Sequence, residues 1–480
     1  MSAVTPFWVA GKPRVGAAVH EVHSPYDGQL VGRHAEPTAA DVDEAVQAAV
    51  DVQPAALATS AAQRAEALMH VSRRITERAE ELAQLITAEN GKPLMWSRIE
   101  VTRGASTFRW AAEEARRWSG ELQRLDTDAT SAGRMALIRR FPNGPVLGIA
   151  PFNFPLNLVA HKVAPALAVG APIIVKPAPA TPLTALLLGE LLAETDLPAG
   201  MWSVLPLANE QTAALVADPR LPVVSFTGSE TVGYHIQSGQ PTKHVVLELG
   251  GNAAAVVLSD WSSDQDLDWA ATRIATFGNY QAGQSCVSVQ RVLVDSSVYD
   301  RFVPLLVEKL NALRTGAPTE DGVQVGPVIN EAAAERIQSW VDDAVASGAQ
   351  LLAGGTRQGT TITPTLLADA PAQAKVSCEE VFGPVMTVSR FTGVDEALAA
   401  VNDSRFGLQA GLFTHDVQVA FRAHRDLLVG GVVIGDVPSF RADQMPYGGI
   451  KASGLGREGL RAAMTDLTHD RVMVLTGLDL

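Results

Sequence analysis

Cysteine, positive charge and long hydrophobic runs are all scarce in this sequence. Two cysteines in 480 residues cannot form a disulfide framework, and they suit a reducing compartment. The longest apolar run, residues 163–175, holds 13 residues with two prolines and is too short to span a bilayer. The chain opens on Met1 to Thr5 without the basic residues of a signal peptide. We therefore expect a cytoplasmic protein without a membrane partner.

The charge of the chain is acidic. It contains 38 lysines and arginines against 52 aspartates and glutamates, which gives a net charge of −14 and a pI near 5.2. Because a nucleic-acid partner would need a basic face, we expect none. A small anionic substrate stays open, since a single pocket can be locally basic. No H-E-x-x-H or C-x-x-C spacing occurs, so we expect no metal site.

The composition and periodicity are those of a folded α/β protein. Apolar residues make up 47% and charged residues 19%, which excludes whole-chain disorder, and the length suits two or three domains. Apolar residues recur at helical spacing over 41–52, 61–89 and 97–118, which predicts a helical first third. From residue 146 to about 435, short apolar runs alternate with helical ones, which predicts parallel sheets covered by helices.

Two glycine-rich strings are candidates for a dinucleotide-binding turn. GLGREG at 454–459 has the G-x-G-x-x-G spacing, but it follows a turn and leaves too little chain for a βαβ unit. We interpret it as a loop that leads into a helix. SFTGSETVG at 225–233 directly follows a predicted strand, and a helix is expected from Ser229. Free amides and the helix dipole there would suit a phosphate, with a plain tight turn as the alternative.

Cys286 and Glu248 are the two side chains that point to chemistry. Cys286 lies in a loop of small and polar residues, unlike a structural cysteine, although a lone cysteine more often belongs to the core. Cys378 gives weaker grounds and is interpreted as structural. Glu248 ends a predicted strand among apolar residues, which would raise the pKa of its carboxyl toward that of a useful base. A buried, paired glutamate is the alternative.

Seven strings together resemble the aldehyde dehydrogenase superfamily, the non-phosphorylating NAD(P)-dependent enzymes, over essentially the whole chain. They are PFNFPL (151–156), VKPA (175–178), FTGS (226–229), ELGG (248–251), GQSC (283–286), EEVFGP (379–384) and MPYGGIK (445–451). The resemblance implies an α/β fold with a Rossmann-like coenzyme domain, an α/β catalytic domain and a small β extension for oligomerisation. The expected residues of these parts are, in that order, 1–119 with 141–247, 248–450, and 120–140 with 464–480. It also implies a homodimer or a homotetramer.

The same resemblance assigns the chemical roles. Cys286 would be the nucleophile that forms a thiohemiacetal and then a thioester, with hydride transfer to NAD(P) in between. Asn153 would stabilise the oxyanion, and Glu248 would activate water to release a free carboxylic acid. CoA-acylating relatives lack that glutamate, so its presence favours hydrolysis. A cysteine hydrolase or amidase without redox chemistry is the alternative.

The expected coenzyme contacts follow the family's motifs. Lys176 would contact the adenosine ribose or its 2′-phosphate, and Ser229 the pyrophosphate. Phe152, Gly228, Gly233, Glu380 and Phe382 complete the expected coenzyme site. Many NAD-preferring relatives carry a glutamate three residues after the lysine, where this chain has Pro179. NAD is the expected coenzyme, and NADP stays open.

Two arginines suggest the charge of the substrate, a small-molecule aldehyde. Arg103 and Arg441 align with positions at which relatives that act on phosphorylated, phosphonylated or carboxylated aldehydes place arginines. Phe154 and His161 complete the expected substrate site, while Ser285 stands where a third arginine would precede the nucleophile. These residues raise the hypothesis of a small anionic aldehyde in a partly apolar pocket. The alternative is that both arginines are surface or ion-paired residues.

Overall fold

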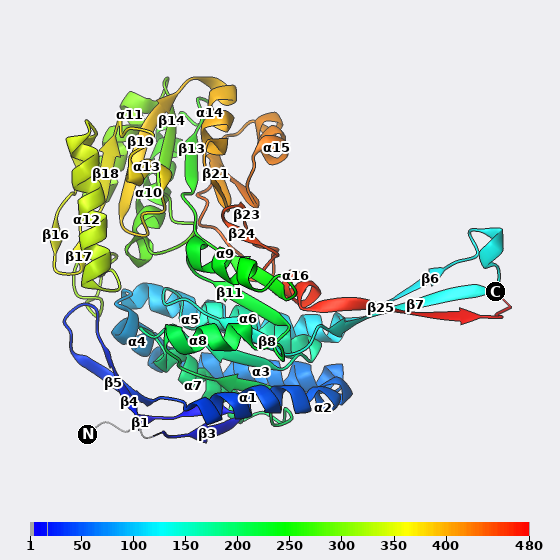
Figure 1. Ribbon diagram of the computed structural model, residues 1–480. Coiled ribbons are helices and arrows are strands. Elements are labelled where there is room, and N and C mark those ends of the chain that lie inside the picture. Colours follow the sequence, from blue (N-terminus) through cyan, green and yellow to red (C-terminus); the bar gives the residue numbers. More distant parts are fainter. Residues whose placement is uncertain (1–3, 17, 480) are drawn as a thin grey trace.

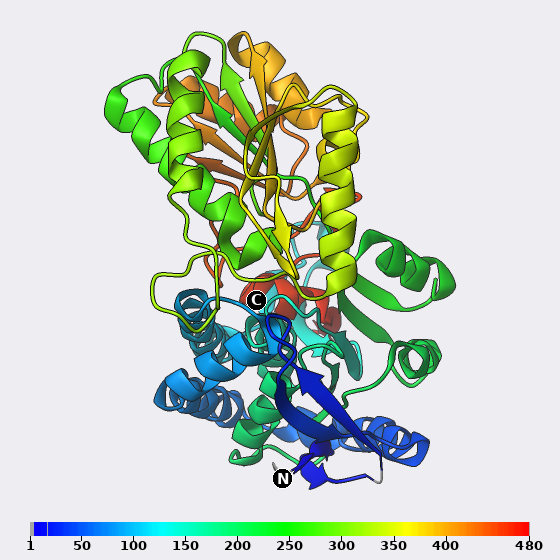
Figure 2. The ribbon, with the colours of Figure 1, turned by 90° about the vertical axis from the view of Figure 1, so that its left-hand side faces the viewer.

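Two α/β lobes and one projecting arm make up the structure, a computed structural model that describes residues 4–16 and 18–479 (Figure 1). Figure 2 looks from the side opposite the arm and shows the lobes one above the other. Met1 to Ala3, part of the segment in which no signal peptide is expected, lie outside the described residues. No described helix is long and apolar enough to cross a membrane.

The first lobe is built on an eight-stranded sheet in the order β24-β12-β11-β8-β9-β10-β2-β3. The strands in that order are Gly454–Leu455, His244–Glu248, Val223–Thr227, Val146–Ile149, Ile173–Lys176, Trp202–Val204, Phe7–Val9 and Lys12–Arg14. The five from β12 to β10 are parallel, and their residues are almost entirely buried. Continuous burial of short Val/Ile-rich strands is what helices on both faces of a parallel sheet require.

In the part of the chain that the structure describes, ten helices surround this sheet. They are α1 (Ala39–Asp51), α2 (Gln53–Ala58), α3 (Ala61–Glu77), α4 (Ala79–Asn90), α5 (Leu94–Arg117), α6 (Asn157–Val169), α7 (Leu183–Ala193), α8 (Asn209–Ala217), α9 (Glu230–Gly239) and α16 (Leu460–Asp466). Helix α6 is buried along its whole length, which explains its nearly continuous apolar sequence. The single helix expected over 61–89 is wrong: α3 and α4 are separate, because Arg78 leaves the helical conformation between them (φ −103°, ψ 25°).

The second lobe is built on a seven-stranded sheet in the order β15-β18-β19-β14-β13-β21-β22. The strands in that order are Gln350–Ala353, Thr365–Ala368, Val385–Phe391, Arg291–Asp295, Ala254–Val257, Gln409–Phe413 and Gly431–Ile434, and only β15 runs antiparallel. Its helices are α10 (Asp264–Asn279), α11 (Tyr299–Asn311), α12 (Glu331–Ala346), α13 (Lys375–Cys378), α14 (Gly393–Asn402) and α15 (Val417–Asp426). Alternate residues of β13 pack against α10 and α11 on one face and against α14 and α15 on the other.

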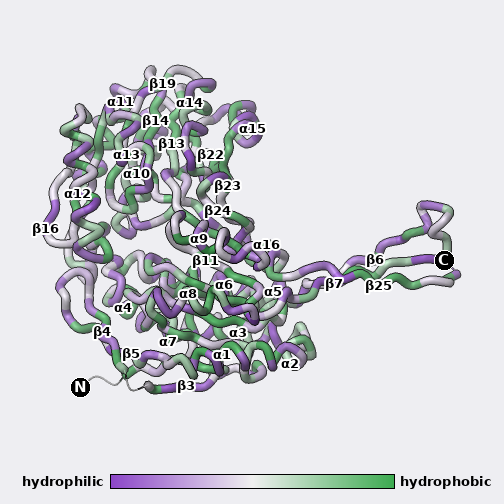
Figure 3. The backbone as a smooth tube through the Cα atoms, viewed as in Figure 1, coloured by the Kyte–Doolittle hydropathy of each residue, from purple (hydrophilic) through white to green (hydrophobic). Residues whose placement is uncertain are grey.

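The arm is a three-stranded antiparallel sheet, β25-β7-β6, that leaves the first lobe (Figures 1 and 3). Its strands are β6 (Glu121–Arg124), β7 (Arg134–Pro142) and β25 (Thr468–Thr476), with the short helix η1 (Ala129–Ser131) at the tip. Figure 3 shows hydrophobic residues along the outer part of β25, where Val472, Met473 and Val474 are exposed. The arm coincides with the expected β extension, whose oligomeric role stays a prediction.

Short strands complete the described chain. They are β1 (Val4–Thr5), β4 (Val19–His23) and β5 (Leu30–Ala35) in one small sheet, and the pairs β16 (Arg357–Gln358) with β17 (Thr361–Ile362) and β20 (Phe406–Gly407) with β23 (Ile450–Lys451). After the second lobe the chain returns to the first, because β24 pairs with β12 and α16 packs on α5 and α6. The residue-level domain division, including the boundary at 450, remains a prediction.

Candidate active site

A cavity of about 760 Å³ lies at the carboxyl ends of the parallel strands β8, β9, β11 and β12. Ligands of open α/β sheets bind at this edge, where loops leave the strands. The second lobe supplies the opposite wall. The cavity brings together ten of the fourteen predicted site residues, namely Phe152, Asn153, Lys176, Gly228, Ser229, Glu248, Cys286, Glu380, Phe382 and Arg441.

The loop that carries Cys286 has an unusual backbone. Gln281, Ala282 and Gly283 all adopt left-handed conformations, with φ of 56°, 52° and 71°. Such strain in non-glycine residues persists only where the surroundings fix it. Here the Gln281 amide donates to Asn90 Oδ1 (2.6 Å), and the Asn90 amide donates to the carbonyl of Phe152 (2.7 Å). Buried side chains therefore tie the cysteine loop to the turn that carries Asn153.

The thiol of Cys286 lies 2.9 Å from the Tyr447 hydroxyl. Burial raises the pKa of this thiol to about 12, although the hydrogen bond with Tyr447 opposes the rise. The thiol is therefore protonated at neutral pH in this structure.

The side-chain amide of Asn153 faces the same loop. Its Nδ2 donates to the carbonyl of Gln284 (2.9 Å), two residues before Cys286. Its Oδ1 is buried and has no hydrogen-bond partner among the described residues. This places the Asn153 amide beside the backbone of the Cys286 loop, where a fixed donor could meet a charge that develops next to the thiol.

Glu248 is an acid at the end of β12 with no hydrogen bond to hold it ionised. Both of its carboxylate oxygens are buried without a partner among residues 4–16 and 18–479. Burial raises the pKa of Glu248 well above its usual range, and the nearby carboxylate of Glu458 raises it further. A carboxyl with a raised pKa in a cavity is suited to accept a proton near neutral pH.

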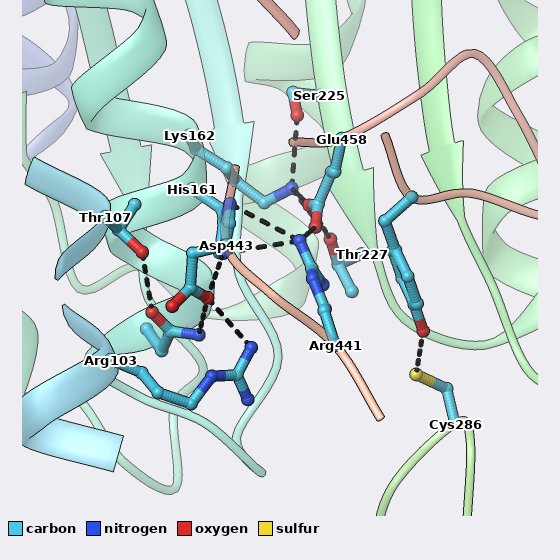
Figure 4. A network of polar contacts seen from close by, with 12 residues as sticks. Arg103, Thr107, His161, Lys162, Ser225, Thr227, Cys286, Arg441, Asp443 and Glu458 are labelled. Carbon is cyan, nitrogen blue, oxygen red and sulfur yellow. Dashed lines mark hydrogen bonds and ion pairs between the residues drawn. The ribbon is translucent and has the colours of Figure 1, made fainter. Parts of the chain in front are cut away.

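A network of buried charges lies close to Glu248, because Glu458, Arg441 and Lys162 all affect the pKa of its carboxyl. Figure 4 shows these three charged side chains together. Arg441 Nη2 donates to Glu458 Oε2 (3.0 Å), and its guanidinium lies 3.9 Å over the ring of Tyr447. Lys162 Nζ lies 3.6 Å from Glu458 Oε1. Burial alone would raise the pKa of Glu458, but Arg441 and Lys162 outweigh burial and hold it well below its usual range. Of the two neighbouring acids, Glu458 is the one that carries the charge.

A second carboxylate, Asp443, extends this network to α5. It accepts from Arg103 Nη2 (2.9 Å) and lies 3.1 Å from His161 Nε2. Arg441 Nη2 in turn lies 3.3 Å from His161 Nε2. Arg103, Phe154 and His161, three of the predicted substrate residues, do not themselves line the cavity. Arg103 and His161 are joined to it through Asp443 and Arg441, and Phe154 packs under the amino group of Lys92.

The far end of the cavity suits the adenosine half of a dinucleotide. Lys176 Nζ donates to Asn209 Oδ1 (3.2 Å), and burial lowers the pKa of this amine to about 8. No carboxylate lies within ion-pair distance of it among the described residues. Pro179, in the position that could have supplied one, also lines the cavity. An anionic group of a ligand could therefore take the place of the carboxylate that Lys176 lacks as a partner.

The other residues predicted to contact the coenzyme differ in their surroundings. Ser229 caps α9 without a side-chain hydrogen bond, so amides of the first turn stay open to a phosphate. Glu380 Oε1 accepts from the Gly251 amide (2.9 Å), and Phe382 packs edge-on against Phe152. Gly233 lies outside the cavity lining: a Cβ there would meet Leu249 at 2.5 Å, so this glycine lets α9 pack on the sheet.

Four residues of the site were missed by the sequence argument: Lys162, Asp443, Tyr447 and Glu458. Each lies in or next to a segment that contains another predicted residue or motif. Glu458 belongs to the glycine-rich string at 454–459, which forms β24 and the loop before α16 rather than a phosphate loop. Lys162 offered a signal, because it is a charged residue inside the apolar segment that forms α6.

The chain was also compared with known proteins. The profile of the Aldehyde dehydrogenase family matches residues 8–473. A 3-sulfolactaldehyde dehydrogenase of Priestia aryabhattai is 40% identical over 469 residues, which cover 98% of this chain and 97% of that protein. Aldehyde dehydrogenase 21 of Physcomitrella patens, crystallised with the reaction product succinate, superposes with a TM-score of 0.97 at 41% identity, over 100% of this chain and 99% of that one.

A third comparison concerns the coenzyme. The NADP-dependent glyceraldehyde-3-phosphate dehydrogenase of Bacillus halodurans, crystallised with NADP, superposes with a TM-score of 0.93 at 34% identity, over 99% of this chain and 100% of that one. Family match, full-length identity and fold agree with one another and with the motifs. The chain belongs to the aldehyde dehydrogenase family and is an NAD(P)-dependent enzyme that oxidises an aldehyde to a carboxylic acid.

Proposed function

We propose that the enzyme oxidises small anionic aldehydes to free acids, with Cys286 as nucleophile, Asn153 as oxyanion donor and Glu248 as general base. One observation carries the substrate class: Arg441, whose charge is that of a guanidinium, lines the same cavity as Cys286 and Glu248. Its Nε is buried without a hydrogen-bond partner among the described residues. A guanidinium prefers bidentate partners such as carboxylate, sulfonate or phosphate.

The chemistry divides among the three residues. The sulfur of Cys286 adds to the aldehyde carbon, and the Asn153 amide stabilises the oxyanion of the thiohemiacetal. NAD(P), when bound, accepts the hydride that this intermediate expels. Glu248 then takes a proton from water, which attacks the thioester and frees Cys286. Burial and the carboxylate of Glu458 raise the pKa of Glu248, so the ionisation of this carboxyl links the last step to pH.

Residues on both walls of the cavity would hold the coenzyme. Lys176 would bind the adenosine ribose or its phosphate, the open amides after Gly228 and Ser229 the pyrophosphate, and Glu380 the second ribose. Phe152 and Phe382 would pack beside it. Lys176 has no carboxylate partner among the described residues, and position 179 is a proline rather than an acid. Both features support use of NADP as well as NAD.

Two known proteins similar to this chain support the anionic substrate class. One is a dehydrogenase of 3-sulfolactaldehyde, and the other was crystallised with succinate. The names differ in the anionic group, a sulfonate in one and a carboxylate in the other. What they share is a short chain that ends in a negative charge, which is what Arg441 would bind.

We expect wild type to prefer a short anionic aldehyde over a neutral one of equal length. Arg441→Ala should lower kcat/KM for the anionic aldehyde by about ten- to a hundredfold more than for the neutral one, because a charge-assisted hydrogen bond is lost. Arg441→Lys keeps the charge and should recover part of the loss. A wild-type preference for the neutral aldehyde, or equal losses on both substrates in Arg441→Ala, would overturn the proposed substrate class.

Coenzyme choice is testable at Pro179. Pro179→Glu places a carboxylate near Lys176, so kcat/KM with NADP relative to NAD should fall by about tenfold or more through repulsion of the 2′-phosphate. Ala180→Glu is the matched control: it adds the same charge one residue away, at an exposed position outside the cavity lining. If both variants change the NADP/NAD ratio equally, position 179 does not govern the choice.

We also propose that the arm is the surface through which the chain forms oligomers. Its strands carry exposed apolar residues, Val472, Met473 and Val474 on β25 and Leu122 on β6, and both outer strands have free edges. Exposed apolar edge strands are characteristic of sites where another chain adds. A homodimer or homotetramer would cover them. Both cysteines are free thiols, which accords with the proposed cytoplasmic location.

A further inference from the structure

One side chain is in hydrogen-bond contact with the sulfur of the proposed nucleophile. The hydroxyl of Tyr447 lies 2.9 Å from Cys286 Sγ, and the dashed line at Cys286 in Figure 4 marks this contact. Among the described residues, the sulfur makes no other hydrogen bond, and neither does the hydroxyl. The polar end of Tyr447 therefore serves this one contact.

The position of the hydroxyl is fixed from two sides. Tyr447 and Glu458 exchange two backbone hydrogen bonds, of 3.0 and 2.6 Å. The guanidinium of Arg441 lies 3.9 Å over the ring of Tyr447 and is itself held by Glu458 Oε2 at 3.0 Å. Tyr447 is only 4% exposed and packs in a small apolar cluster beside Cys286. A side chain enclosed in this way keeps its rotamer, so the hydroxyl stays directed at the sulfur.

The direction of the hydrogen bond follows from the chemistry of the two groups. A thiolate carries no proton, so the O–H of Tyr447 must donate once Cys286 has ionised. Tyrosine keeps its proton at neutral pH, and burial raises the pKa of Tyr447 well above its usual range. Tyr447 therefore acts as a donor and not as a base. A hydrogen bond to a charged acceptor is roughly twice as strong as one between neutral groups.

The other surroundings of the sulfur mostly oppose a thiolate. Burial raises the pKa of the Cys286 thiol to about 12, and the charges of Glu380 and Glu248 raise it further. The hydrogen bond from Tyr447 opposes this rise more than the charge of Arg441 does. Glu248 makes no hydrogen bond to the sulfur, because both of its oxygens lack a partner among the described residues. Tyr447 is thus the group that favours a thiolate and also contacts the reacting atom.

We propose that Tyr447 is a catalytic residue whose hydroxyl donates a hydrogen bond to the Cys286 thiolate, both when it attacks the aldehyde and when it leaves the thioester. The proposal rests on Cys286 as nucleophile and adds a residue to that reaction. Before attack the thiol gives its proton to solvent, and an electron pair of the sulfur forms the bond to the aldehyde carbon. In thioester hydrolysis that C–S bond breaks, and its electron pair returns to the sulfur. Tyr447 keeps its own proton in both steps.

Tyr447→Phe tests the hydroxyl alone, because it keeps the ring that packs under Arg441. We expect alkylation of Cys286 by iodoacetamide at about pH 8, without aldehyde or coenzyme, to slow by at least about threefold. The thiolate population should fall about tenfold or more, and the greater nucleophilicity of the more basic sulfur should recover part of that loss. Mass spectrometry of the labelled peptide measures the rate. If the missing hydroxyl only opened space, alkylation would become faster instead.

The same variant should slow both halves of the catalysed reaction. The rate of the first burst of reduced coenzyme and the steady-state kcat should each fall by at least about threefold, because the thiolate attacks in one half and leaves in the other. The burst should still reach one equivalent per site, and the dissociation constant of the coenzyme should stay within about twofold of wild type. Glu248→Gln differs, because only its steady-state rate should fall.

Two controls separate the contact with the sulfur from general damage. Cys378, the other free thiol, should react at the wild-type rate in the same Tyr447→Phe protein. Tyr234→Phe is the matched variant: its hydroxyl donates to the carbonyl of Lys451 (2.9 Å), and Tyr234 lies outside the cavity lining. It should alkylate at Cys286 as wild type does.

The proposal is overturned if Tyr447→Phe alkylates at Cys286 as fast as wild type or faster, or if its burst keeps the wild-type rate. It is also overturned if Cys378 or Tyr234→Phe shows the same slowing. Failure of the proposed function gives a different result, since full activity in Cys286→Ala would remove the nucleophile itself.

Discussion

Cys286→Ala is expected to retain less than about one per cent of NAD(P)-dependent aldehyde oxidation, because removing a nucleophile leaves only binding and oxyanion stabilisation. The variant should fold normally, since the thiol makes a single hydrogen bond, to Tyr447. Steady-state production of reduced coenzyme measures the loss, and thermal unfolding checks the fold. The matched control is Cys378→Ala, which alters the other free cysteine and should keep full activity.

Activity in Cys286→Ala above that level would remove Cys286 from its role. If Cys378→Ala were the inactive variant instead, the nucleophile would be Cys378. That outcome would also place the active site near α13 and outside the cavity described here, because Cys378 does not line this cavity.

Glu248→Gln is expected to separate the two halves of the reaction. Hydride transfer needs Cys286 and Asn153 only, so one equivalent of reduced coenzyme per site should still appear in a rapid burst. Steady-state turnover should then fall by about 10²- to 10⁴-fold, because water is no longer activated. Hydroxylamine, a nucleophile that needs no base, should restore turnover by cleaving the thioester.

The wild-type pH profile gives the same residue a second test. Because burial and Glu458 raise the pKa of Glu248, its carboxylate form grows as pH rises through that raised value. Thioester hydrolysis should therefore accelerate with pH and level off above the pKa, and Glu248→Gln should lose this dependence. If burst and steady state fall together in Glu248→Gln, the residue acts before hydride transfer.

The sequence was enough to predict the parts of the site that lie in local motifs. Cys286 and Glu248 each end or follow a strand or helix in a string that local chemistry singles out, whereas Asn153 was assigned only through the resemblance to the family. The parallel sheet brings strand ends to one edge. The turn between β11 and α9 at Ser229 could likewise be predicted from the sequence, because a strand, a glycine and the start of a helix follow one another directly.

The buried charge network could not be predicted in the same way. Arg441, Glu458 and Lys162 meet only because the chain leaves the second lobe, adds β24 to the first sheet and packs α16 on α6. No local pattern encodes that return. The break at Arg78 was missed as well: apolar spacing runs on through it, so periodicity predicts one helix where the backbone of Arg78 leaves the helical conformation and separates two.

One measurement tests the central claim most directly. Wild-type enzyme is mixed with a short aldehyde sulfonate and NAD or NADP, and the reduced coenzyme and the acid product are both counted. The account predicts one acid formed for each coenzyme reduced, at a kcat/KM above that for a neutral aldehyde of equal length. No reduction of the coenzyme, together with cleavage of a thioester or amide by Cys286, would contradict it and indicate a cysteine hydrolase.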